Sequence, residues 1–337
     1  EFSLATLVRS LMALDFDDLD EQEITNEPDS ITARLYEWET TGEWRDPKEE
    51  EARKARLEEL EKLRLENDEK AKVKAEERRA RRAEREVVQL RKEKAAGKKK
   101  ARKLRLLCLH GVGSSKALWI RQAKKITEAL EGKDIEVLLL EAQNQCTSAE
   151  AVENLEVFFG KKDPKLQYDE REFDERNWIT YVNNEGVLDW MQDKLVELAP
   201  IDGILGFSQG ANFATMLAAQ ASCGEGEPLS FVCLISPNAP GYARPLQRLF
   251  QEKVTVPALI IRGEQETYDV GMGASQFLAG RHIETEGKEA PSEHVKELFK
   301  ETQVFTHSGN WTITAPGKEG EAQIAKTLEF IKLHGKM

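Results

Sequence analysis

The chain has 337 residues, of which 40% are hydrophobic and 33% are charged, and its net charge is −12. An acidic balance of this size argues against a protein that coats nucleic acid. We find no run of about 18 apolar residues and no basic leader followed by an apolar stretch, so we expect neither a membrane span nor a secretory signal. The four cysteines have no CxxC spacing, which favours a cytoplasmic protein without a zinc site.

Uneven charge divides the chain into three parts. Residues 1–47 hold 13 acidic and 3 basic residues, whereas residues 48–105 hold 23 basic and 14 acidic ones. We expect residues 1–47 to form an acidic, weakly structured N-terminal segment. Residues 48–103 are predicted to form a long charged helix that ends in a basic linker, and residues 104–337 to form an α/β domain.

The first of these parts begins with one apolar face of a short amphipathic helix. Its residues are Leu4, Leu7, Val8, Leu11 and Met12. This face has two interpretations, a docking segment for a protein partner and a tail that folds only weakly. The shortness of the segment favours the second interpretation.

The second part lacks Gly and Pro between Lys48 and Ala96, and pairs such as Glu58–Lys62 recur four residues apart. Such pairs stabilise an isolated helix by about 0.2–0.5 kcal/mol each. Its leucines do not sustain a heptad, so we expect a solvated single helix rather than a paired coiled coil. The basic cluster at 98–103 is interpreted as a solvated linker rather than a nucleic-acid site.

Residues 104–337 alternate apolar runs with amphipathic segments. The apolar runs predict buried strands at 104–109, 135–140, 201–205, 231–235, 258–261 and 304–306. Strands that are apolar throughout and alternate with helices indicate a mostly parallel sheet covered on both faces. In such sheets the functional residues gather at the carboxyl ends of the strands.

The motif GFSQG at 206–210 lies where one of these strands meets the next helix. A nucleophile elbow needs glycines at both ends, because side chains there would collide with neighbouring backbone. The motif therefore predicts that Ser208 is a nucleophile at the positive end of a helix.

A second glycine-containing turn, HGVG at 110–113, follows the first strand. Acyl transfer needs donors for the developing oxyanion, and we assign these to the backbone N–H groups of Gln209 and Val112. A dinucleotide-binding loop is disfavoured because Lys116 stands where a third glycine is needed. We expect His110 to be structural, because it precedes the turn.

Residues 104–337 resemble the FSH family of serine hydrolases, which have the α/β-hydrolase fold. The resemblance rests on LLCLHG at 106–111, DGILGFSQGA at 202–211, ALIIRG at 258–263 and a His-x-Gly element at the end. It implies cleavage of a carboxylic ester or thioester through an acyl-enzyme on serine, with no metal and no organic cofactor.

The resemblance also implies an acid and a histidine. The family's acid stands three residues after the glycine that closes the penultimate strand, which is Glu266 here, with Asp269 as the alternative acid. The family's last strand ends in His-x-Gly-Gly-His, and the second histidine is the base. Here Trp311 occupies that position, and His307 matches the first histidine. An indole nitrogen only donates, so either His307 acts as base through a rearranged loop or the triad is broken.

Two functions therefore stand side by side. The first is a serine hydrolase acting on a small-molecule ester or acyl-thioester, and the second is a catalytically degenerate binding module on the same fold. Aromatic residues in the connection before the helix at 187–198 are either a lid that contacts the acyl chain or core anchors. They are Phe158, Phe159, Tyr168, Phe173 and Trp178.

Overall fold

A computed structural model describes residues 47–96, 102–149, 152–153, 156–157, 161–173, 178–266 and 291–335. The acidic segment at 1–46 and the alternative acid Asp269 lie outside the described residues, as do Phe158 and Phe159. The predictions made for these residues therefore stay predictions.

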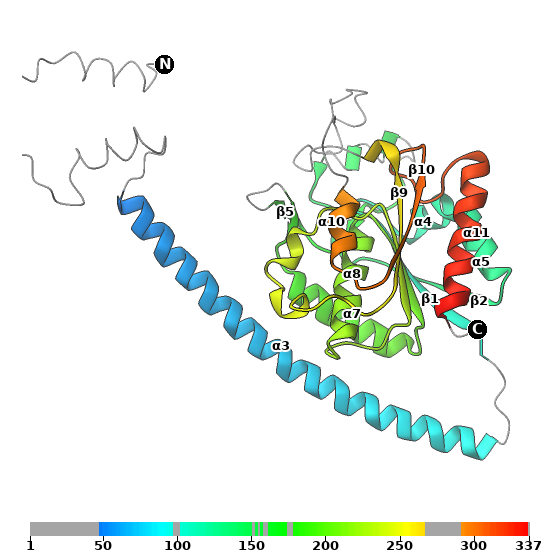
Figure 1. Cartoon of the computed structure of the whole chain (residues 1–337), viewed down its shortest axis with the longest axis horizontal. Coiled ribbons are helices and arrows are strands. Elements are labelled where there is room, and N and C mark those ends of the chain that lie inside the picture. The colour runs from blue at the N-terminus through cyan, green and yellow to red at the C-terminus, as the bar shows by residue number, and fades with distance from the viewer. Residues whose placement is uncertain are drawn as a thin grey trace, which may run out of the picture. The chain divides into compact units, whose positions relative to one another are not determined.

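The centre of the fold is a six-stranded sheet in the order β10-β9-β8-β7-β1-β2, in which all neighbours are parallel (Figure 1). The strands are β1 (Leu104–Leu109), β2 (Ile135–Leu140), β7 (Gly203–Phe207), β8 (Phe231–Ile235), β9 (Ala258–Gly263) and β10 (Thr302–His307). The central strand β8 is buried at all five positions, as expected for a strand covered on both faces. The predicted parallel sheet is confirmed.

Helices cover both faces of this sheet. One face carries α7 (Asn184–Leu198), α8 (Gln209–Ser222) and α10 (Pro291–Glu297), and the other carries α4 (Lys116–Gln122), α5 (Lys124–Glu131) and α11 (Gly317–His334). Successive side chains of a strand point to opposite faces, so Leu107 joins the first hydrophobic cluster and Leu106 the second. Burying such a side chain contributes about 1.5–3 kcal/mol.

Short elements decorate the sheet between these helices. The antiparallel pairs β3 (Asn144–Gln145) with β4 (Leu166–Gln167) and β5 (Arg171–Phe173) with β6 (Ile179–Tyr181) lie between β2 and α7. The 3-10 turns η2 (Gly241–Ala243), η3 (Gln247–Leu249) and η4 (Glu264–Glu266) follow β8 and β9.

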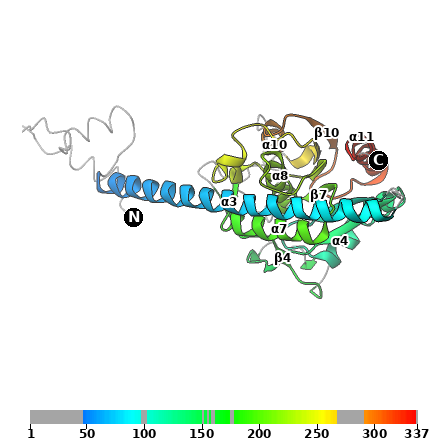
Figure 2. The same cartoon turned by 90° about the horizontal axis from the view of Figure 1, so that it is seen from below.

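The predicted N-terminal helix is present as α3 (Pro47–Ala96). The compact unit that contains the sheet begins within this helix, at Asp68. In that unit α3 lies beside α7, because Arg78 pairs with Asp189 (Figure 2). Ala75 is only 2% exposed. The expectation of a solvated helix is therefore wrong for this part of α3, where ion pairs to the α/β domain supplement the helix's own propensity.

A single arginine links α3 to three other parts of the same unit. Arg248 of η3 donates to Asp68 of α3 at 3.0 Å, to Glu185 of α7 at 2.9 Å and to Glu225 at 3.3 Å. Its side chain is 7% exposed, and the acidic neighbours raise its pKa against the opposing effect of burial. Five guanidinium N–H groups in a fixed fork allow one arginine to serve several carboxylates.

In the described part of the chain, no helix has a segment long and apolar enough to cross a bilayer.

Candidate active site

Ser208 occupies a strained turn between β7 and α8. Its backbone has φ 52° and ψ −117°, in the region that L-residues rarely adopt, and its N–H donates to Ile235 O at 2.9 Å. A Cβ at Gly206 would lie 2.3 Å from Gly210 O, and one at Gly210 would lie 2.2 Å from Leu109 O. The two glycines therefore have the steric role that the motif indicates. A conformation of this kind costs about 1–3 kcal/mol and persists where the surrounding structure enforces it.

The turn after β1 approaches Ser208 closely. A Cβ at Gly111 would lie 3.3 Å from Ser208 Cβ. Among the described residues, the backbone N–H groups of Val112 and Gln209 have no hydrogen-bond acceptor. Two unused donors beside a half-buried hydroxyl are the arrangement that an oxyanion requires.

The side chain of Gln209 forms hydrogen bonds to the segment that connects β2 and α7, and so joins this segment to the turn at Ser208. Its Oε1 accepts from Tyr168 N–H at 2.7 Å, and its Nε2 donates to Asp169 O at 2.8 Å. Tyr168 is 1% exposed, and its hydroxyl donates to Leu140 O at 2.8 Å. Of the two interpretations of the aromatic residues, Tyr168 is a core anchor.

The His110 ring stabilises the turn after β1 through hydrogen bonds to backbone groups. Its Nδ1 lies 2.9 Å from Gly111 O, and its Nε2 accepts from Ala142 N–H at 3.1 Å, which assigns the proton to Nδ1. Its ring stacks on Tyr168 with centroids 4.9 Å apart, and burial lowers its pKa. Both ring nitrogens are occupied by backbone groups, in agreement with the expected structural role.

Glu266 lies in η4, directly after β9, and is 3% exposed. Its Oε1 accepts from Ser236 Oγ at 2.7 Å and from Gly263 N–H at 2.9 Å. Burial raises the pKa of this carboxyl to about 7, although both hydrogen bonds and the charge of Arg262 favour ionisation. The side chain thus titrates near neutral pH.

Ser236 is a functional candidate that sequence reasoning missed. It follows β8 with φ 50°, and its N–H donates to Ile261 O at 2.8 Å. The residues before Ser208 and Ser236, Phe207 and Ile235, are partners in the sheet. The two serines therefore end neighbouring strands at the same level. A serine after an apolar run was the available signal, but turn serines are too common for it to be distinctive.

His307 ends β10 opposite Gly263 and is 1% exposed. Its Nδ1 accepts from Gly309 N–H at 3.2 Å, which assigns the proton of the neutral ring to Nε2. Within the described residues Nε2 has no hydrogen-bond partner. Burial lowers the pKa of the ring, against the opposing charges of Glu319 and Glu264. In this state Nε2 is a donor and cannot take a proton from a serine.

No hydrogen bond among the described residues joins Ser208, His307 and Glu266 to one another. The contact found instead is the one between Glu266 and Ser236. Trp311 is half-buried, and its backbone N–H donates to Asn310 Oδ1 at 2.8 Å. Across the described ranges, no cluster of three or more His, Cys, Asp or Glu side chains is arranged to hold a metal ion.

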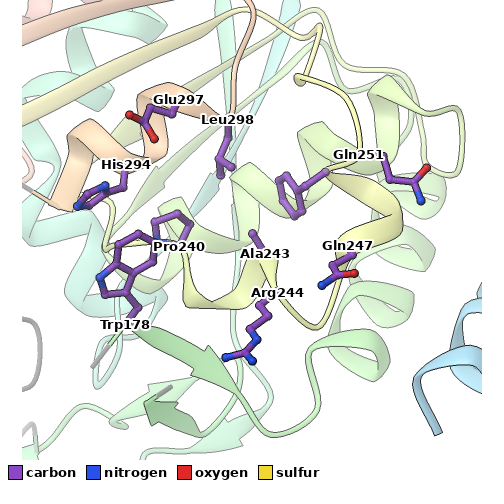
Figure 3. A pocket seen from close by; sticks show the side chains of 10 residues that line it. Trp178, Pro240, Ala243, Arg244, Gln247, Gln251, His294, Glu297 and Leu298 are labelled. Carbon is purple, nitrogen blue, oxygen red and sulfur yellow. The ribbon is translucent and has the colours of Figure 1, made fainter. Parts of the chain in front are cut away.

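A pocket of about 970 Å³ lies between the turns η2 and η3 and helix α10 (Figure 3). Trp178 and His294 form one wall, with ring centroids 4.5 Å apart, and Phe250 is also among the lining residues. None of Ser208, Glu266 and His307 lines this pocket. It is therefore separate from the residues that end the sheet.

The family model described as "Serine hydrolase (FSH1)" matches residues 99–295, more than half of the chain. The chain belongs to the FSH1 serine hydrolase family. The matched range of this FSH1-family chain includes Ser208 and Glu266. It stops before β10, and so before His307 and Trp311.

Sequence relatives carry esterase names. Esterase OVCA2 of Bos taurus is 28% identical over 232 residues, which cover 66% of this chain and 94% of that protein. Esterase OVCA2 of Homo sapiens is 25% identical over 237 residues, with coverages of 66% and 95%. Among solved structures, esterase PE8 has a TM-score of 0.44 at 17% identity, and covers 68% of this chain and 93% of its own.

Proposed function

We propose that this FSH1-family chain hydrolyses a small-molecule carboxylic ester or acyl-thioester through an acyl-enzyme on Ser208. The observation that carries the proposal is the strained turn at Ser208, with φ 52° at the start of α8. Strained backbone conformations of this kind cluster at active sites. Membership of a serine hydrolase family and the esterase names of the relatives support the same class of reaction.

In the proposed reaction Ser208 Oγ attacks the carbonyl carbon of the substrate while its proton passes to a base. The carbonyl oxygen becomes an oxyanion that accepts hydrogen bonds from the N–H groups of Gln209 and Val112. The C–O or C–S bond then breaks, and the leaving group takes the proton. Water repeats the sequence on the acyl-enzyme and releases the acid. Removing one donor of such a hole typically lowers kcat by about 100- to 1,000-fold.

The proposed reaction needs a base that accepts the proton of Ser208. His307 with Glu266 as its orienting acid is the assignment that the family resemblance implies. For this, His307 must release Gly309 N–H and carry its proton on Nδ1, the reverse of its present hydrogen bonding. Glu266 must in turn reach that proton, although its Oε1 now accepts from Ser236.

A second function, a binding module without catalysis, has a specific observation in its favour. Trp311 stands at the base position, and the described hydrogen bonds leave Ser208 without an imidazole partner. Loss of the base alone lowers kcat by about 10⁶-fold in a serine hydrolase. The intact elbow at Ser208 favours the enzyme, because a binding module has no use for a strained nucleophile.

A fluorophosphonate probe separates the two functions. We expect the full-length protein to be labelled and Ser208→Ala not to be labelled. Ser222→Ala is the matched control, because Ser222 lies at the other end of α8 and its hydroxyl accepts from the N–H groups of Thr255 and Val256. No labelling of the folded protein would rule out the hydrolase. Labelling that survives His307→Ala would remove His307 from the reaction.

We propose residues 104–337 as the catalytic domain, with the helix and basic linker at 48–103 as an appended element and 1–47 as the acidic segment. The amphipathic start of that segment is the proposed site for a protein partner.

The cysteines described are all free thiols, and Cys223 is exposed. Free thiols support a reducing compartment such as the cytoplasm.

A further inference from the structure

The ends of three adjacent strands bring two serines and one carboxyl into a row. Ser208 follows β7, Ser236 follows β8 and Glu266 follows β9 by three residues. The order β9-β8-β7 places Ser236 between the other two. Neighbouring strands lie about 4.8 Å apart, so the site must bridge about two strand spacings between Ser208 and Glu266.

Two independent features mark Ser236 as more than a turn residue. Its backbone has φ 50°, close to the 52° of Ser208, in a region that favours glycine. Its hydroxyl is completely buried and donates to Glu266 Oε1 at 2.7 Å. The one described hydrogen bond of this buried hydroxyl therefore goes to a buried carboxyl, and it holds the carboxyl oxygen Oε1 in place.

We propose that Ser236 is a positioning residue whose hydroxyl fixes the Glu266 carboxyl at the sheet edge on the side of Ser208, so that hydrolysis depends on the Ser236–Glu266 pair. The inference rests on the proposed function and deepens it. An acid that orients an imidazole needs one carboxyl oxygen held in place, and Ser236 supplies that restraint on Glu266 Oε1.

The surroundings of the pair make its ionisation measurable. Arg262 on β9 lowers the pKa of Glu266, and burial raises it to about 7. Arg262 in turn pairs with Glu293 of α10 at 2.9 Å, Glu264 lies on the same turn as Glu266, and His307 ends the neighbouring strand β10. The hydrogen bond from Ser236 favours the ionised carboxylate, so its loss raises the pKa of Glu266 further.

The first test follows ester hydrolysis by the full-length protein against pH, with p-nitrophenyl acetate as the probe. In Ser236→Gly we expect the apparent pKa of Glu266 in the pH profile of kcat to rise by about one unit. The reason is that a hydrogen bond to a charged group changes an ionisation constant by about tenfold or more. KM should change less than twofold. Glycine suits a positive φ, so this variant keeps the fold.

Ser236→Thr is the complementary variant. It keeps the hydroxyl but places a β-branched residue at positive φ, so it should lower the melting temperature and leave that apparent pKa unchanged. A merely structural role predicts the opposite pattern, with the activity profile following stability. If the pH profile of kcat in Ser236→Gly has the same apparent pKa as in wild type, the inference is wrong.

A readout without catalysis separates this inference from the proposed function. In the Ser208→Ala background, stability should fall as pH rises from the unfolded pKa of Glu266, 4.5, to its folded pKa, about 7, because the folded protein keeps a proton that the unfolded chain releases. Ser236→Gly should extend this fall by about one unit, and should have no such effect when Glu266→Gln is also present. If the pH range of the stability loss is the same with and without Ser236→Gly, the inference is wrong even if Ser208 is labelled. If that range shifts but the protein with Ser208 intact neither hydrolyses the ester nor is labelled, the proposed function is wrong and the Ser236–Glu266 interaction is only structural.

Discussion

Ser236 Oγ donates a hydrogen bond to Glu266 Oε1 at 2.7 Å, and both residues are buried at the carboxyl edge of the sheet. The acid expected from the family resemblance is therefore in a defined hydrogen-bonded position, but its partner is a serine and not a histidine.

Glu266→Gln should flatten the dependence of stability on pH. The folded-state pKa of about 7 exceeds the ordinary 4.5, so ionisation destabilises the fold progressively between these values. The shift corresponds to about 3 kcal/mol of unfolding free energy lost across that window. Urea unfolding at pH 5 and pH 8 measures it. Equal pH dependence in the variant and in wild type would show that Glu266 ionises normally.

Gly210→Ala should be among the most damaging substitutions in the chain. The new Cβ would lie 2.2 Å from Leu109 O, so β1 and α8 must separate. We expect a loss of about 3 kcal/mol or more and no fluorophosphonate labelling. The control is Gly132→Ala, where φ is −64° and the nearest atom is 3.3 Å away; it should change stability by less than about 1 kcal/mol. Similar stabilities of the two variants would contradict the steric argument.

Tyr168→Phe should weaken the turn after β1. The hydroxyl of Tyr168 accepts from His110 N–H at 3.1 Å and donates to Leu140 O at 2.8 Å, and its removal leaves two buried backbone groups unsatisfied. We expect a loss of about 1–3 kcal/mol in urea unfolding. Tyr242→Phe serves as the control, because among the described residues no backbone group depends on the buried Tyr242 hydroxyl, so its loss should cost much less.

Arg248→Met should loosen α3 around Asp68, while the pair of Arg78 with Asp189 farther along the helix remains. It leaves the carboxylates of Asp68, Glu185 and Glu225 clustered without their shared cation. Breaking a buried ion pair costs about 3–5 kcal/mol. Chemical unfolding measures the loss, and proteolysis within α3 should speed up in parallel. Lys194→Ala, at an exposed pair with Glu197, should change stability by less than about 0.5 kcal/mol. Unchanged proteolysis in Arg248→Met would show that the cluster does not hold α3.

Local patterns predicted the sheet and the elbow well. Strands such as β8 are uninterrupted apolar runs, and the spacing of GFSQG at 206–210 specifies its turn chemically, so both are legible without tertiary contacts. The helix at 47–96 was equally visible in its composition. Its burial at Ala75 was not, because alanine suits a solvated and a packed helix alike.

Contacts between distant residues could not be predicted in the same way. Arg248 and Asp68 are separated by 180 positions, and nothing local marks them as partners. The hydrogen bond from Gly309 to His307 depends on the path of the loop after β10, which a motif comparison cannot supply. The row from Ser208 to Glu266 likewise emerges only from the strand order.

The contacts of α3 with the α/β domain determine where a truncated form of this protein can begin. A recombinant fragment that starts at Leu104, where the family resemblance begins, would lose Asp68 from the Arg248 cluster and uncover the surface under Ala75. Poor solubility or inactivity of such a fragment would then report a badly placed boundary and say nothing about the chemistry of Ser208. Expression trials should keep the helix from a point before Asp68.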